Sequence, residues 1–287
     1  NSINGGSYNY IEGCSANNTI TGSDTNFVAR QGQGKITKNA SMGAFNDVNV
    51  GRCNGGTAHG NILTGSELGT YSTGSDAYIC YNNISGYNNI ILTCGGPDVP
   101  GYKNNYALTV HSTISGGYCN YIESSASDNQ ASYLQTSTIA GGYYNKINID
   151  GGCVLSSTIG GGYCNRIYGT ASNTNVIGGG AENRLYGGYT ASAVIAGGKA
   201  NCISGDLSYH TLIGGGYSNQ ICGNYAPRNI IVGGSENTID NGNTSVIGGG
   251  RYNEINGGYH SGIMSGKCNV INGGYAYVQT IVGGYNN

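Results

Sequence analysis

The sequence contains no tryptophan, only two phenylalanines and only three prolines in 287 residues. Charged residues make up 9% of the chain, and its 12 basic and 14 acidic residues are scattered singly. Because the large apolar side chains of an ordinary globular core are scarce, a thick hydrophobic core is not expected. Because the basic residues form no stripe, nucleic acid is not expected as a partner.

Long apolar runs and close cysteine pairs are also missing. No run approaches the ~20 apolar residues of a membrane-spanning helix, so membrane insertion is not expected. The ten cysteines include no Cys-x-x-Cys pair, so neither a thiolate metal site nor a cofactor is expected. Cys119, Cys164 and Cys268 share one repeat position. They are interpreted either as small packed residues or as disulfide partners of unknown pairing.

Glycine (54 residues) and tyrosine (25 residues) dominate instead, and they belong to a repeated block, Ile-x-Gly-Gly-x-x-Asn-x-Ile. Its asparagines are Asn120, Asn145, Asn165, Asn183, Asn201, Asn219, Asn237, Asn253, Asn269 and Asn287. The isoleucines six residues before them are Ile114, Ile139, Ile159, Ile177, Ile195, Ile213, Ile231, Ile247, Ile263 and Ile281. Successive asparagines are 25, 20, 18, 18, 18, 18, 16, 16 and 18 residues apart, so one side of each coil accepts insertions.

The block predicts a strand, a tight glycine turn and a second strand. In the second strand the asparagine and the aliphatic residue two positions later face the same side, which we expect to be the interior. The predicted fold is an all-β parallel β-solenoid with two short strands per coil of about 18 residues. Coils are regular over residues 112–287 and degenerate over 1–111, in one continuous array.

The repeated asparagines have two interpretations. Stacked coils would place the amides over one another, so that they form an internal hydrogen-bonded ladder together with the isoleucines. Alternatively, each asparagine occupies a left-handed turn position, which this residue type tolerates. The ladder is the favoured interpretation, because an isolated buried amide would be costly whereas a stacked one finds partners.

The segment 243–255, Asn-Thr-Ser-Val-Ile-Gly-Gly-Gly-Arg-Tyr-Asn-Glu-Ile, resembles the head repeats of YadA-like trimeric autotransporter adhesins. Ile-Gly-Gly-Gly-x-x-Asn repeats are also similar to those of fibre and surface proteins of phages and large DNA viruses. The resemblance covers residues 112–287 well and 1–111 faintly. It implies a left-handed β-roll, three chains side by side, and a role in surface projection and attachment.

Other functional motifs are weak. Tyr118, Tyr143, Tyr163, Tyr217 and Tyr285 all follow the double glycine and form either an exposed contact stripe or a packing column. The block around Gly160–Asn165 is similar to calcium-binding nonapeptides, but asparagine replaces the aspartate that calcium prefers. The histidines, with no shared repeat position, and the scattered acids predict no catalytic site.

These observations predict a non-catalytic structural protein, the shaft or head of an adhesin-like or virion fibre that mediates extension and attachment. Its expected partners are further copies of itself, in a trimer or filament, and a glycan or cell-surface receptor. Its expected location is extracellular, on a cell or on a virion. The second hypothesis is a single-chain β-solenoid that binds glycan or calcium on one face, and the third is a β-helix enzyme.

Overall fold

The structure is a computed structural model that describes only the strands of residues 1–111, and residues 112–287 except 126–131, 151–152, 155, 170–173, 189–191 and 207–208. Every described element is a strand, and neighbouring strands pair in parallel, as in β24 (Val176–Ile177) with β26 (Val194–Ile195). No helix long and apolar enough to cross a membrane occurs among the described residues. The predicted all-β parallel β-solenoid is confirmed.

The chain divides into two compact units, Asn1–Ser156 and Ser157–Asn287. In the first unit, three sheets run through the coils. The first sheet contains β1 (Ser2–Asn4), β4 (Thr19–Thr21), β7 (Ala40–Met42), β10 (Ile62–Ser66), β13 (Asn83–Tyr87), β16 (Thr113–Ile114) and β19 (Thr138–Ile139). The second contains β2 (Tyr10–Ile11), β5 (Phe27–Arg30), β8 (Asn46–Val50), β11 (Leu68–Thr73), β14 (Ile90–Cys94), β17 (Tyr121–Ser125) and β20 (Lys146–Asp150).

The third sheet of this unit contains β3 (Ser15–Ala16), β6 (Lys35–Thr37), β9 (Thr57–His59), β12 (Asp76–Cys80), β15 (Tyr106–Val110), β18 (Ser132–Gln135) and β21 (Cys153–Val154). The prediction of two strands per coil is therefore wrong for the first unit. The reason is coil length, because Asn120 and Asn145 are 25 residues apart and β18 lies in the additional segment. The sequence analysis divides degenerate coils, 1–111, from regular coils, 112–287. That division lies inside the first unit and does not coincide with the boundary between the two units.

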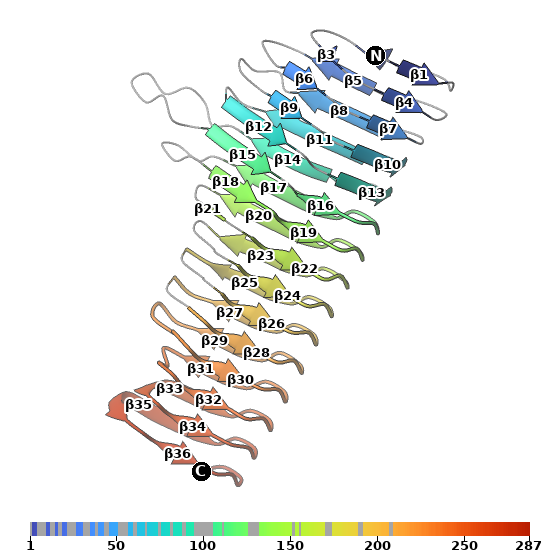
Figure 1. Ribbon diagram of the computed structural model, residues 1–287. Helices are drawn as coiled ribbons and strands as arrows, with labels where there is room; N and C mark the ends of the chain where they lie inside the picture. The colour runs from blue at the N-terminus through green and yellow to red at the C-terminus, as the bar shows by residue number, and fades with distance from the viewer. Residues whose placement is uncertain are drawn as a thin grey trace, which may run out of the picture. The chain divides into compact units, whose positions relative to one another are not determined.

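In the second unit, strands alternate between two sheets, and Figure 1 shows them laid coil on coil from β24 to β36. The first sheet contains β22 (Thr158–Ile159), β24, β26, β28 (Leu212–Ile213), β30 (Ile230–Ile231), β32 (Val246–Ile247), β34 (Gly262–Ile263) and β36 (Thr280–Ile281). The second contains β23 (Arg166–Gly169), β25 (Arg184–Gly187), β27 (Cys202–Ser204), β29 (Gln220–Cys222), β31 (Thr238–Asp240), β33 (Glu254–Tyr259) and β35 (Val270–Tyr277).

The core consists of two columns of aliphatic side chains, one from each of these sheets. Each coil contributes the isoleucine six residues before the repeat asparagine and the Ile or Leu two residues after it. The predicted column is fully buried at Ile114, Ile139, Ile159, Ile177, Ile195, Ile213, Ile231, Ile247 and Ile263. Because consecutive coils present identical side chains in register, each isoleucine packs on its equivalents above and below.

Two left-handed corners shape each coil of the second unit. One is the residue directly before the repeat asparagine, such as Glu236 at φ 57°, and the other lies nine residues before it, such as Thr244 at φ 57° for Asn253. His210 and His260 share this second corner, which corrects the expectation that no repeat position holds more than one histidine. Both are exposed, as expected for residues at a corner.

Candidate functional site

The repeat asparagines form a buried column that joins one coil to the next. The Asn201 amide nitrogen Nδ2 donates to the carbonyl oxygen of Gly197 at 3.0 Å in its own coil and to that of Gly216 at 3.1 Å in the next. Its Oδ1 accepts the backbone N–H of Asn219 at 2.9 Å. The structure buries all nine predicted ladder residues, Asn120, Asn145, Asn165, Asn183, Asn201, Asn219, Asn237, Asn253 and Asn269.

The bonding differs in one respect from the predicted amide ladder. Most of the partners given for these amides are backbone groups, and amide-to-amide bonds join the asparagines from Asn219 to Asn287, for example Asn237 Nδ2 to Asn219 Oδ1 at 3.1 Å. The alternative placement of asparagine at a left-handed turn is wrong for this column, because the left-handed residue is its predecessor, such as Ser218 at φ 53°. The column is a structural element that holds the coils in register.

The five predicted contact tyrosines share one repeat position just after the glycine turn, and within each unit the residues at this position are joined by isolated parallel bridges. In the first unit the rings of Tyr118 and Tyr143 are 5.9 Å apart. In the second unit the column reads Tyr163, Ala181, Lys199, Tyr217, Ser235, Arg251, Lys267 and Tyr285. Tyr163 and Tyr217 are each 49% exposed, but two other residue types separate them, so the column is not a continuous aromatic stripe there.

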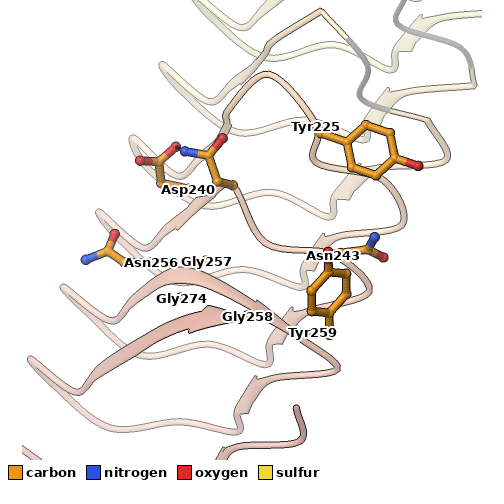
Figure 2. A pocket seen from close by; sticks show the side chains of 9 residues that line it. Tyr225, Asp240, Asn243, Asn256, Gly257, Gly258, Tyr259 and Gly274 are labelled. Carbon is orange, nitrogen blue, oxygen red and sulfur yellow. Dashed lines mark hydrogen bonds between the residues drawn. The ribbon is translucent and has the colours of Figure 1, made fainter. Parts of the chain in front are cut away.

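A groove of about 550 Å³ opens on the loop side of the second unit (Figure 2). Its lining residues come from four successive coils and are Tyr225, Asp240, Asn241, Asn243, Asn256, Gly257, Gly258, Tyr259 and Gly274. Tyr225, Asn243 and Tyr259 stand on one side of a glycine floor, whereas Asp240 and Asn256 stand on the other (Figure 2). None of the lining residues is a lysine or an arginine.

Coil length explains the groove. Between the buried aliphatic residue of the second strand and the corner nine residues before the next repeat asparagine, each coil has a loop-side segment. Four successive segments are 222–227, 240–243, 256–259 and 272–277. The two middle segments have four residues each and the outer two have six. The shorter segments leave a recess between the longer ones, and Gly257, at φ 70°, lies at a β-bulge between β33 and β35.

Hydrogen bonds fix the polar side of the groove. The backbone N–H of Asn224 donates to Asn241 Oδ1 at 3.2 Å, and Asn241 Nδ2 donates to Asp240 Oδ1 at 3.0 Å. Asn256 Nδ2 donates to Asn272 Oδ1 at 3.0 Å. Asp240 Oδ2 receives no hydrogen bond from the described residues. Asp240 and these amides therefore form a hydrogen-bonded polar network on one side of the groove.

The Cys222 thiol, which pairs with Asp240 across β29 and β31, donates to Asp240 Oδ1 at an Sγ–O distance of 3.6 Å. Burial, followed by the negative charge and hydrogen bond of Asp240, raises the pKa of the Cys222 thiol to about 12. Of the predicted disulfide candidates, Cys164 and Cys268 are free thiols in the structure, and so are Cys202 and Cys222. Because a thiol is nucleophilic only as the thiolate, this raised pKa disfavours reaction of Cys222 at neutral pH.

We expect Cys222 in the folded protein to react with iodoacetamide about 100-fold more slowly, at mildly alkaline pH, than in the urea-unfolded chain, because so little thiolate is present. Peptide mapping by mass spectrometry measures the rate at each cysteine. Asp240→Asn removes the charge that disfavours the thiolate and should accelerate the reaction several-fold. Equal rates in the folded wild type and in the unfolded chain would contradict the assigned burial and pairing.

Sequence reasoning missed two features of this unit. One is a third buried column of small, mostly polar residues eight positions before each repeat asparagine, including Asn229, whose Nδ2 donates to Gly242 O at 2.7 Å. The sequence indicates this column only weakly, because the position holds Ser, Asn, Ala, Thr or Gln in different coils. The other is the groove, whose signal was two consecutive spacings of 16 residues.

The described residues contain no group of three or more His, Cys, Asp or Glu side chains that could hold a metal ion. The repeat and the groove are built from amides, glycines and tyrosines, with Asp240 as the one carboxylate of the lining. A scan against protein-family models and searches of curated proteins and of solved structures gave no match to this chain.

Proposed function

We propose that this chain is a non-catalytic structural protein that forms the shaft or head of an adhesin-like or virion fibre. The proposal rests on the buried columns of asparagine and isoleucine. In each coil of the second unit the asparagine Oδ1 accepts the backbone N–H of the equivalent asparagine in the next coil, so successive coils are joined by the same contacts. Each coil therefore offers the next coil a matching surface, and the stack becomes longer as repeats are added. Extension of a surface projection is the function that this construction serves best.

The proposal includes a left-handed β-roll, with two strands in each coil of about 18 residues, in an extracellular or virion location. The repeat positions carry amides and aliphatic groups rather than titratable side chains, which favours a structural over a catalytic role. Attachment then depends on the exposed loop side, where the coils differ from one another.

The proposed assembly is a homotrimer with chains side by side. Each coil buries only two large aliphatic side chains, so a single chain has a slender core. Val232, Met264 and Val282 all lie five residues before a repeat asparagine, in one column, and are 57%, 45% and 77% exposed. A second copy of the chain packed along this column would remove these side chains from water.

Native mass spectrometry should show a species of three times the 29.5 kDa chain mass. Changing Val232, Met264 and Val282 together to lysine places charge in the proposed interface and should convert the trimer to monomer. Tyr163→Lys, which adds a lysine in a different exposed column, should leave the trimer intact. A stable monomer of the wild type at all accessible concentrations would refute the side-by-side trimer.

A further inference from the structure

We propose that the loop-side groove of the second unit binds a neutral carbohydrate, as a disaccharide-sized unit of a surface oligosaccharide. The inference rests on the proposed attachment function and names what the fibre attaches to. The groove lies entirely within the second unit and is lined by Tyr225, Asp240, Asn243, Asn256 and Tyr259 around the glycine floor.

The shape of the groove suits an extended small ligand. Its volume of about 550 Å³ lies within the ~300–1,000 Å³ that is typical of small-molecule sites. The outer segments 222–227 and 272–277 form its two ends, and the short segments between them form its floor. Glycines leave this floor without side chains, so that a flat ring can lie against the backbone.

The chemistry of the two sides matches the two kinds of surface on a sugar. A pyranose ring has an apolar C–H face and an edge of hydroxyl groups, and aromatic rings together with amide or carboxylate oxygens recognise these surfaces. Tyr225 is 56% exposed and Tyr259 faces the same side, whereas Asp240 and Asn256 stand opposite (Figure 2). A sugar in the groove would contact the tyrosine rings on one side and the side-chain oxygens of Asp240 and Asn256 on the other.

The groove is ordered before any ligand arrives. Tyr259 stacks on Tyr277 with ring centroids 5.2 Å apart and an interplanar angle of 20°, which restrains its ring. The backbone next to Tyr225 is anchored by Ala226, which is fully buried. Because Tyr259 and this backbone are held in place without a ligand, their ordering adds little to the conformational entropy lost on binding.

Charge distinguishes the ligand class from its competitors. An anionic sugar, a sulfate or a phosphate would meet the negative charge of Asp240 with no cation in the lining. Calcium takes six to eight oxygen ligands, several of them carboxylates, and this lining supplies one carboxylate. An apolar peptide would find glycine and amide groups where it needs hydrophobic pockets. A neutral, hydroxyl-rich ligand fits the remaining chemistry.

The test uses the full chain on an array of neutral oligosaccharides built from glucose, galactose, mannose, fucose, N-acetylglucosamine and N-acetylgalactosamine, followed by saturation-transfer NMR with the disaccharides that bind. Tyr225→Ala should weaken binding about tenfold through loss of the aromatic face. Asp240→Asn should weaken it several-fold. Insertion of Gly-Ser between Asn241 and Gly242, which restores the longer segment and fills the recess, should abolish it.

The matched controls are Tyr217→Ala, which removes a tyrosine of similar exposure outside the groove, and Glu182→Gln, which removes a carboxylate elsewhere. Both should bind as the wild type does. The inference is overturned if no neutral oligosaccharide binds, if calcium chloride alone produces the only response, or if the groove variants bind as tightly as the controls. The native mass of each variant separates this outcome from failure of the fibre proposal, because loss of the groove should leave the oligomer unchanged.

Discussion

Replacement of Gly234 by alanine is expected to lower the free energy of unfolding by about 4 kcal/mol, among the largest effects of any single substitution in this chain. Gly234 has φ +92°, a conformation that side chains disfavour. Its added Cβ would overlap the carbonyl oxygen of Gly250 and lie 2.6 Å from Asn237 Nδ2. The substitution therefore strains the turn and displaces an amide of the buried column.

The adjacent Gly233 supplies a matched control, because the same turn contains a glycine with no such constraint. A Cβ at Gly233 would meet no atom within 4 Å, and its φ lies outside the range of +20° to +160° that side chains disfavour. Gly233→Ala should change stability by less than about 1 kcal/mol, with a small gain from reduced freedom of the unfolded chain. Urea denaturation followed by circular dichroism measures both variants, and a similar loss in both would contradict the role assigned to Gly234.

The parts of the fold that sequence reasoning predicted are those in which one residue type recurs at one position. Burial of Ile213 and Asn219 in every coil follows from alternation within a strand and from the repeat, so both columns could be predicted without coordinates. The column that contains Thr211 and Ser245 was harder to predict in this way, because several small residues satisfy the same space and no single residue type occupies the position in every coil.

The third sheet and the groove escaped prediction for different physical reasons. Strands such as β12 and β15 mostly pair different residues, for example Tyr78 with Leu108 and Ile79 with Thr109, because their hydrogen bonds join backbone groups and tolerate many side chains. The groove forms because segments 240–243 and 256–259 are shorter than their neighbours. The sequence feature that indicates it is therefore a change in the spacing of the repeats rather than a motif. Spacing between repeats is therefore as informative as the residues that the repeats contain.

Asn201→Ala is expected to lower the free energy of unfolding by about 3 kcal/mol. The substitution removes three hydrogen bonds at once and leaves the backbone N–H of Asn219 buried without its acceptor. A buried donor without a partner costs ~1–3 kcal/mol, and the lost side-chain volume adds to it. Hydrogen exchange should accelerate most at Asn219. Asn224→Ala, at an exposed position, should have an effect below about 0.5 kcal/mol.

Asn201→Asp separates hydrogen bonding from packing, because the new side chain has the same shape but no Nδ2 donor. At neutral pH its carboxylate would face the carbonyl oxygens of Gly197 and Gly216, so the charged form is disfavoured and the pKa of the introduced carboxyl group rises on folding. Stability is then greatest below the ordinary aspartate pKa of ~3.9 and is lost as pH rises through the folded value. The wild type has no titrating group at this position, so the difference in urea midpoint between the two proteins should shrink on acidification. If that difference does not depend on pH, the amide at position 201 acts through its volume alone, and the buried column is not what holds successive coils together.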